Sequence, residues 1–220
     1  MNYVKRAWEL TLIFSLVCTG VLAENESISA PAILNAPENT EVSTDDSYSS
    51  GILDLVTGWN FVGIPRRLGE GKNKATIFSA VESEGRSIWS YETEKGGWKE
   101  LTADDILMPL DGYFVYSNKP VQIPLSYSID PLQVPPVKDL AAGWNMVGFS
   151  GATPASARDS LLSIRKTWTQ VIGWDPSGQK FDETIINGGN GTHADSAMLI
   201  PMRAYWVFAS DPCSLASIGA

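Results

Sequence analysis

One serine of this chain lies in a sequence context similar to that of the nucleophile in serine hydrolases. Ser150 belongs to the stretch Gly-Phe-Ser-Gly-Ala at residues 148–152, between a predicted strand and a predicted helix, which is where a nucleophile elbow stands. His193, the only histidine, would act as the base, oriented by Asp195 or Asp211. The last residue of the stretch departs from the motif, and the pattern of an α/β sheet is missing. We therefore predict a simple turn and no enzyme; a serine hydrolase using Ser150 and His193 is the alternative.

An Asn- and Gly-rich loop at residues 187–195 is a second group of residues that could carry chemistry. Its side-chain and carbonyl oxygens suit Ca²⁺, but it lacks the spaced carboxylates of a known calcium loop. The loop is predicted to be either neutral or in contact with a cation, ligand or partner through Asn187, Asn190, His193 and Asp195. No metal site and no cofactor are predicted for the chain.

Tryptophans form a third group, because exposed aromatic rings can stack on sugars. Trp59, Trp144 and Trp206 occupy positions that occur twice in the sequence. Repetition at fixed strand positions is what a core requires, so we predict that these three are buried. Trp98 and Trp168 are less constrained, and they are the candidates for contact with a carbohydrate.

The elements that must position these residues come in two copies. Three blocks recur in the same order: the signature Gly-Trp-Asn-x-Val-Gly, an aromatic hairpin, and an apolar closing run that contains Tyr. They span residues 58–63 and 143–148, 89–98 and 172–181, and 107–116 and 199–208. Matched blocks in the same order indicate an internal duplication. The second copy is nine residues longer between its hairpin and its closing run, and the loop at 187–195 lies in that insertion.

Each copy reads as strand, short helix, hairpin and strand. The signature is apolar on both alternating faces, which is typical of a strand buried on both sides, and the buried amides of Asn60 and Asn145 should tie it to an adjacent loop. Thr153 is the expected N-cap of the second helix, followed by Pro at its first position. Edge strands are expected around residues 121–129. The sequence thus predicts a mainly β protein.

The domain organisation follows from the repeat. We predict two tandem homologous antiparallel β modules, at residues 51–130 and 131–220. Each is a small α+β unit with one short helix, and the two are related by pseudo-two-fold symmetry. A function specific to this chain is expected where the copies differ rather than in the signature that they share.

The N-terminal segment predicts export. Lys5 and Arg6 precede an uncharged, mostly apolar run at residues 10–23, which is the layout of a secretory signal peptide at residues 1–23. The run is short for a membrane span, so membrane attachment is expected only if the signal stays uncleaved. Residues 24–50 are predicted to be a disordered acidic linker, because they are polar and their few apolar residues show no period.

Charge and cysteine content limit the partners. The formal net charge is −9, and removal of the signal makes it one unit more negative, so nucleic acid is not an expected partner. Cys18 would leave with the signal, and Cys213 would then have no partner within the chain. Sequons at Asn25 and Asn190 make both asparagines candidates for glycosylation in an exported protein.

The paired signatures resemble modules of secreted and surface-layer-associated proteins of methanogenic archaea and some bacteria. The matching residues are 58–63 with 112–115, and 143–148 with 205–207; Ala204 replaces the Gly before Tyr in the second copy. The resemblance implies an extracellular or cell-surface location and no shared catalytic site. We predict a structural or adhesive protein that contacts other envelope proteins or surface glycans, with a carbohydrate-binding module as the alternative.

Overall fold

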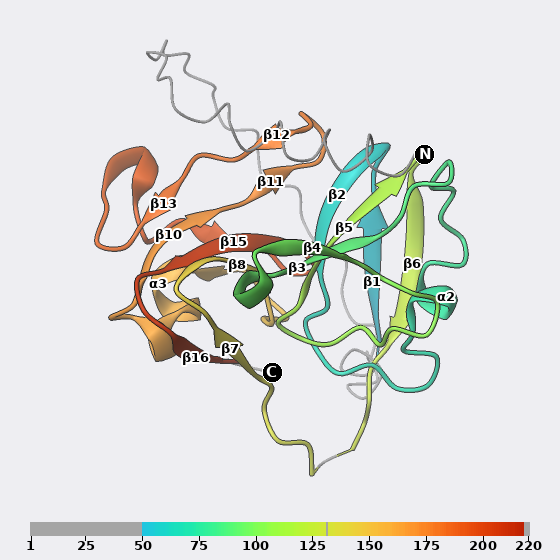
Figure 1. Ribbon diagram of the computed structural model, residues 1–220, viewed down its shortest axis with the longest axis horizontal. Helices are drawn as coiled ribbons and strands as arrows, with labels where there is room; N and C mark the ends of the chain where they lie inside the picture. Colours follow the sequence, from blue (N-terminus) through green and yellow to red (C-terminus); the bar gives the residue numbers. More distant parts are fainter. Residues whose placement is uncertain (1–49, 131, 218–220) are drawn as a thin grey trace, which may run out of the picture. The chain divides into compact units, whose positions relative to one another are not determined.

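Two four-stranded antiparallel sheets contain the two copies of the signature. The computed structural model describes residues 50–130 and 132–217, all of which belong to one structural unit (Figure 1). One sheet has the strand order β2-β5-β3-β4 and the other has the order β13-β10-β15-β8. The signature strands β2 and β8 therefore lie at the edges of their sheets, each beside the closing strand of its own half, β5 or β15. The prediction of a mainly β fold is confirmed.

The strands are short, and helical turns are few among the described residues. The strands are β1 Ser50–Leu55, β2 Gly58–Gly63, β3 Trp89–Glu92, β4 Gly97–Glu100, β5 Gly112–Ser117, β6 Val121–Ser126, β7 Val137–Leu140, β8 Gly143–Gly148, β9 Ala155–Ser156, β10 Trp168–Ile172, β11 Trp174–Asp175, β12 Lys180–Phe181, β13 Ile185–Ile186, β14 Met198–Leu199, β15 Ala204–Ala209 and β16 Cys213–Ala216. The helical elements are α2 Lys74–Ile77, η2 Thr93–Lys95, α3 Ala157–Ser160, η3 Leu162–Ile164 and η4 Gly191–His193.

The first and last strands of each half pair with one another. In the first half β1 pairs with β6, and in the second half β7 pairs with β16, both antiparallel. The predicted edge strand around residues 121–129 is β6, whereas β1, β7 and β16 had no signal in the repeat. The predicted boundary between modules, at residues 130 and 131, falls in the connector between β6 and β7. The predicted signal peptide, Asn25 and residues 24–49 lie outside the described residues, and Ser50 already begins β1.

The second helix starts later than the sequence predicted. Ser156, not Thr153, is the N-cap of α3, and its hydroxyl accepts a hydrogen bond from the backbone N–H of Asp159. Residues 155–156 first form β9, which pairs with β14 and holds the chain extended up to the cap. In the first half Asn73 caps α2 in the same way, with its side chain accepting from Thr76 N at 2.9 Å.

Two clusters of buried apolar residues form the core, one in each half. The first cluster runs from Leu53 to Tyr127 in sequence, and the second from Leu110 to Leu215. Their ranges overlap because the halves exchange one side chain. Leu110, from the first half, is 2% exposed in the second cluster, and its counterpart Met202 packs against the first cluster. Both residues have a positive φ, 65° and 63°, which costs about 1 kcal/mol or more for a residue with a side chain.

The last glycines of the two signatures bring the halves into contact. Gly63 N donates to Met202 O at 3.1 Å, and Gly148 N donates to Leu110 O at 3.0 Å. A Cβ on Gly63 would lie 2.5 Å from the Cα of Gly148 and 2.8 Å from Arg203 O. The main chains approach so closely that neither position has room for a side chain.

The signature asparagines connect each strand to the turn before it, as predicted. The Asn60 amide accepts from Val56 N at 2.9 Å and donates to Val56 O at 2.9 Å and Gly58 O at 3.0 Å. Asn145 makes the same three bonds to Ala141 and Gly143. Both side chains are buried, so each amide satisfies backbone groups that water does not reach.

Replacing Gly63 with alanine should destabilise the whole protein. The added methyl group would meet main-chain atoms of the second half, which cannot move aside as a flexible side chain can. We expect a loss of at least about 2 kcal/mol in the free energy of unfolding, measured by urea titration with tryptophan fluorescence. Gly97→Ala is the matched control, because its Cβ would meet only Lys95 O, at 3.9 Å; its effect should stay within about 0.5 kcal/mol. Equal effects of the two changes would contradict the glycine contact.

Replacing either signature asparagine should cost a similar amount. Asn60→Ala and Asn145→Ala each leave buried backbone groups without partners, which we expect to cost about 1–3 kcal/mol in urea unfolding. Asn190→Ala, at an exposed position, is the control and should change stability by less than about 0.5 kcal/mol. A large difference between Asn60→Ala and Asn145→Ala would show that the two turns are not equivalent.

Candidate functional site

The serine and histidine that could form a catalytic pair have other partners. Ser150 is 6% exposed, and its hydroxyl accepts a hydrogen bond from that of Ser217 at 3.0 Å. His193 lies in η4, and its Nδ1 contacts the carbonyl oxygen of Thr184 at 2.7 Å. No hydrogen bond joins Ser150 and His193 within residues 50–130 and 132–217, and Asp195 pairs with Arg158 at 3.6 Å instead.

Most polar side chains of the inserted loop hold the loop itself. The amide of Asn187 donates to Arg165 O at 2.8 Å and to Trp168 O at 2.9 Å, and Asp195 accepts from Gly188 N at 3.2 Å. These contacts fix the loop against the start of β10. Asn190 and His193 are exposed, so contact with a partner through them, and glycosylation of Asn190, stay predictions.

Only some of the tryptophans lie where the sequence placed them. Trp168 is 1% exposed within the second core cluster, so the prediction that it contacts a carbohydrate is wrong; its place at the first residue of β10 turns the ring inward. Trp98 is half-buried and packs edge-on against Tyr91 and Trp206. Trp206 is buried as predicted, whereas Trp59 and Trp144, near the start of edge strands, are only half-buried.

A cavity of about 350 Å³ opens between the hairpin of the first half and the strands β7 and β8 of the second half. We call it the open groove. Its lining combines charged groups, hydroxyls and a few apolar side chains: Ser90, Tyr91, Glu92, Thr93, Glu94, Lys95, Lys99, Leu101, Asp105, Ile106, Asp111, Gly112, Tyr113, Lys138, Asp139, Ala141, Asn145 and Met146. Thr93, in the hairpin turn, donates to Trp144 O at 2.8 Å and so fixes the turn to β8.

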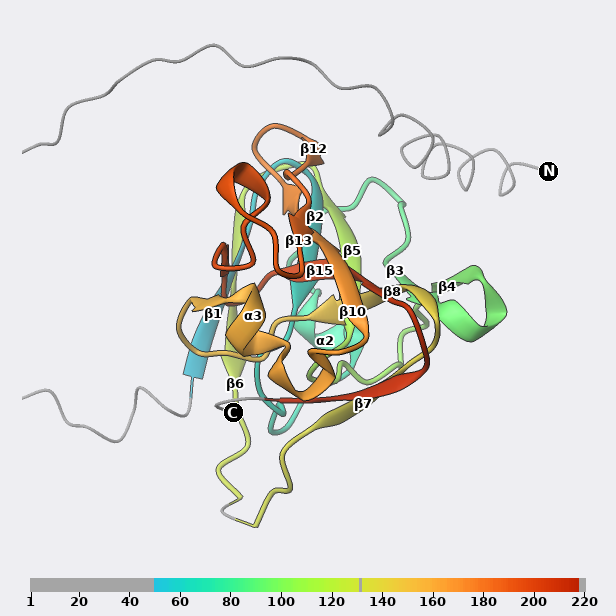
Figure 2. The ribbon, with the colours of Figure 1, turned by 90° about the vertical axis from the view of Figure 1, so that its left-hand side faces the viewer.

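The corresponding place in the other half has a different set of side-chain contacts. There the hairpin of β11 and β12 lies over β2 (Figures 1 and 2). The Gln179 amide accepts from Trp59 N at 2.8 Å and donates to Trp59 O at 3.0 Å. The residue that matches Gln179 in the first hairpin is Gly96, which has no side chain. Both have a positive φ, 51° and 60°, so the two turns share this backbone conformation, and only the second turn carries a side chain at this position.

Two further differences keep the open groove open. Where the first half has Asp111, the second has Arg203, whose guanidinium reaches Trp174 O and lies 3.1 Å from Asp182. Burial raises the pKa of Asp182, and Arg203 acts in the opposite direction. Where the first hairpin has the half-buried Tyr91, the second has Trp174, which is 3% exposed and donates to Trp59 O at 2.9 Å. At these two positions the first half has the shorter or smaller side chain.

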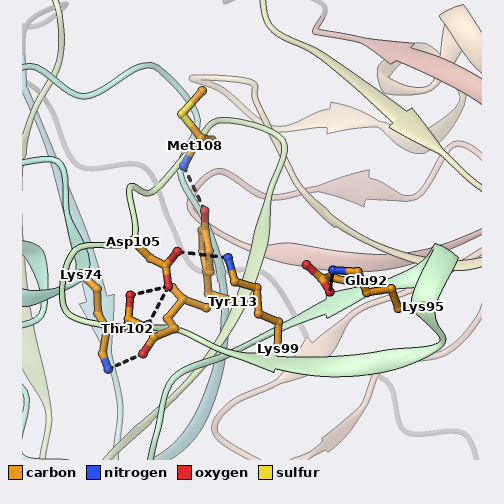
Figure 3. A network of polar contacts seen from close by, with 9 residues as sticks. Lys74, Glu92, Lys95, Lys99, Thr102, Asp105, Met108 and Tyr113 are labelled. Carbon is orange, nitrogen blue, oxygen red and sulfur yellow. Dashed lines mark hydrogen bonds and ion pairs between the residues drawn. The ribbon is translucent and has the colours of Figure 1, made fainter.

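Ion pairs hold the charged groups of the open groove in place. Lys99 lies 3.0 Å from Asp105, Lys95 lies 2.8 Å from Glu92, and Lys138 pairs with Asp111. Figure 3 shows the first two pairs and the hydrogen bonds around Asp105. Bonds from the backbone N–H of Thr102, from Lys99 and from the Thr102 hydroxyl lower the pKa of Asp105 to about 2. Asp105 is therefore ionised, and accepts hydrogen bonds, at any ordinary pH.

Tyrosines in the closing strands fix the chain that leads into each sheet. The hydroxyl of Tyr113 accepts from Met108 N at 2.9 Å, and that of Tyr205 accepts from Ile200 N at 2.7 Å. Burial raises the pKa of both hydroxyls, so both stay protonated. Tyr113 thus forms a neutral, fixed part of the floor of the open groove.

Sequence reasoning missed the open groove, although a signal for it existed. The copies differ at single matched positions as well as by the insertion that holds residues 187–195. Aligning the hairpins residue by residue pairs Gly96 with Gln179, and aligning the closing runs pairs Asp111 with Arg203. A loss of side-chain volume and a reversal of charge at matched positions mark the half in which a space remains.

Replacing Asp105 should lower stability in a pH-dependent way. Because its pKa is lower in the folded protein than the usual value of about 3.9, ionised Asp105 contributes stability above about pH 4, and this contribution is lost as the pH falls through about 2. We expect Asp105→Asn to lower the midpoint of thermal unfolding at pH 6, with the difference vanishing near pH 2. Asp104→Asn, at an exposed neighbour, is the control and should show no such change. A difference that persisted unchanged at pH 2 would contradict this role.

Neither the geometry of single groups nor likeness to other proteins assigns a function. Among residues 50–130 and 132–217, no three His, Cys, Asp or Glu side chains gather in a way that could hold a metal ion. The helices in the same part of the chain are all too short or too polar to span a membrane. No family model, curated protein or solved structure matches this chain.

Proposed function

We propose that this chain is an exported, non-enzymatic protein of the cell surface that acts by contact with envelope proteins or surface glycans. The observation that carries the proposal is the open groove, a polar cavity at a place where the other half has Arg203 and Trp174 instead of Asp111 and Tyr91. A binding protein needs a fixed site of this kind. The groups brought together in the groove are ion pairs and hydroxyls, which suit contact with a polar partner.

The framework supports a structural role. Its halves make reciprocal contacts: Gly63 with Met202 and Gly148 with Leu110, and Tyr91 on Trp206 at 5.2 Å with Trp174 on Phe114 at 5.9 Å. We infer that they are homologous modules related by pseudo-two-fold symmetry, as the repeated sequence predicts. A contact surface built across two such modules is held by both of them.

Export is the second part of the proposal. It rests on the predicted signal peptide at residues 1–23, on the acidic charge, and on the resemblance to modules of surface-layer-associated proteins. A carbohydrate-binding module is the rival within the same proposal. The open groove favours it, because its size and hydrogen-bonding groups suit a small polar ligand.

The proposal is tested by locating the protein in cells that make it naturally. We expect the full chain in the medium or the cell-surface fraction, and Leu16→Arg, which places a charge in the predicted signal, inside the cell. The double change Gly96→Gln and Asp111→Arg, which gives the open groove the residues of its counterpart, should lower the surface-bound fraction at least tenfold. A cytoplasmic location of the unaltered chain would overturn the proposal, and so would surface binding unaffected by the double change.

A further inference from the structure

We propose that the open groove binds a neutral saccharide of one or two sugar units. This inference rests on the proposed function and names the ligand of the same site. It differs from the prediction based on Trp98 and Trp168, because the contacts come from the hairpin turn, from Asp111 and from β7.

The volume of the groove sets the size of the ligand. A cavity of about 350 Å³ is at the lower end of the range for small-molecule sites, about 300–1,000 Å³. In the other half, Arg203 stands in place of Asp111 and donates a hydrogen bond to Trp174 O. The open groove therefore has room for a compact group rather than for a long chain.

The charges of the groove favour a ligand that has hydroxyl groups and no charge. Three lysines are already paired with carboxylates, at Glu92, Asp105 and Asp111. A charged ligand would have to separate these pairs, whereas a hydroxyl can accept from an ammonium and donate to its carboxylate at the same time. The lining holds five carboxylates and three ammonium groups, so an anionic sugar would also be repelled.

Apolar groups in the lining suit the C–H faces of a sugar ring. Tyr91 and Ile106 line the groove beside the ion pairs. The Tyr91 ring is held edge-on by Trp98 at 5.5 Å and Trp206 at 5.2 Å. Its position is thus set before a ligand arrives, which lowers the entropic cost of binding.

Two aspartates at matched positions allow the groove to be tested separately from its counterpart in the other half. Asp139 on β7 lines the open groove, and Asp54 holds the same place on β1. Both are exposed, and each accepts one hydrogen bond from the paired strand, Asp139 from Ser214 and Asp54 from Gln122 at 2.8 Å. Replacing either aspartate with alanine removes a carboxylate and its hydrogen bond to the paired strand. Only the carboxylate of Asp139 lines the groove of the proposed ligand.

The test is binding of small saccharides to the full chain, by saturation-transfer NMR and calorimetry. The probes are the methyl glycosides of glucose, galactose and mannose, the disaccharides cellobiose and lactose, glucuronate as the anionic analogue, and tetralysine as a cationic peptide. We expect at least one neutral probe to bind, with glucuronate at least tenfold weaker than glucose if glucose is that probe. Asp139→Ala should weaken binding at least fivefold, and Asp54→Ala should leave it unchanged. The double change Gly96→Gln and Asp111→Arg should abolish it.

Several results would overturn the inference. They are the absence of binding by every neutral probe, binding by tetralysine alone, and equal affinities of the Asp139→Ala and Asp54→Ala proteins. Asp139→Ala keeps the test decisive if the double variant does not fold. A protein that is retained on the cell surface through the groove, but binds none of these sugars, would leave the proposed function standing and overturn the saccharide.

Discussion

The approach of two glycine backbones, Gly63 and Gly148, sets the relation between the halves of this protein. Each glycine ends a signature strand, and each donates its N–H to the chain of the other half just before that half's closing strand. The contact leaves no space for a Cβ on Gly63, and a Cβ on Gly148 would meet the carbonyl oxygen of Asp111. Because main-chain atoms occupy the space that a Cβ would need, only glycine fits at the end of each signature.

The contact also explains why two residues with side chains take up strained backbone conformations. Leu110 and Met202 each supply the carbonyl that accepts from a glycine, and each has a positive φ. The turn at this position points the side chain toward the other half, where Leu110 enters the second core cluster and Met202 packs against the first. Burial of an apolar side chain contributes about 1.5–3 kcal/mol, which offsets a strain of about 1 kcal/mol or more.

The sequence predicted the framework better than the site. The repeated signature predicted β2 and β8, and the polar residue inside an apolar strand predicted the role of Asn60 and Asn145, because a buried amide must find partners. The strands β1, β7 and β16 were missed, since almost all of their residues lie outside the matched blocks. Trp168 was misplaced because the periodicity of a five-residue strand does not say which face is inside. The open groove lies between two halves that are far apart in the sequence, so only a comparison of matched positions in the two copies, such as Asp111 with Arg203, could indicate it.

Leu110 and Met202 link the two cores, because the side chain of each packs with the core of the other half. Their carbonyl groups also link the two backbones. If one half unfolds, the core of the other half loses a side chain that packs in or against it. The two clusters should therefore unfold together, although they are built from different strands. Within the connector between β6 and β7, the Tyr127 hydroxyl contacts Met202 Sδ at 3.8 Å, but the glycine contacts and the exchanged side chains lie elsewhere. A protease that cut the connector after Tyr127 would therefore break the chain and leave the protein assembled.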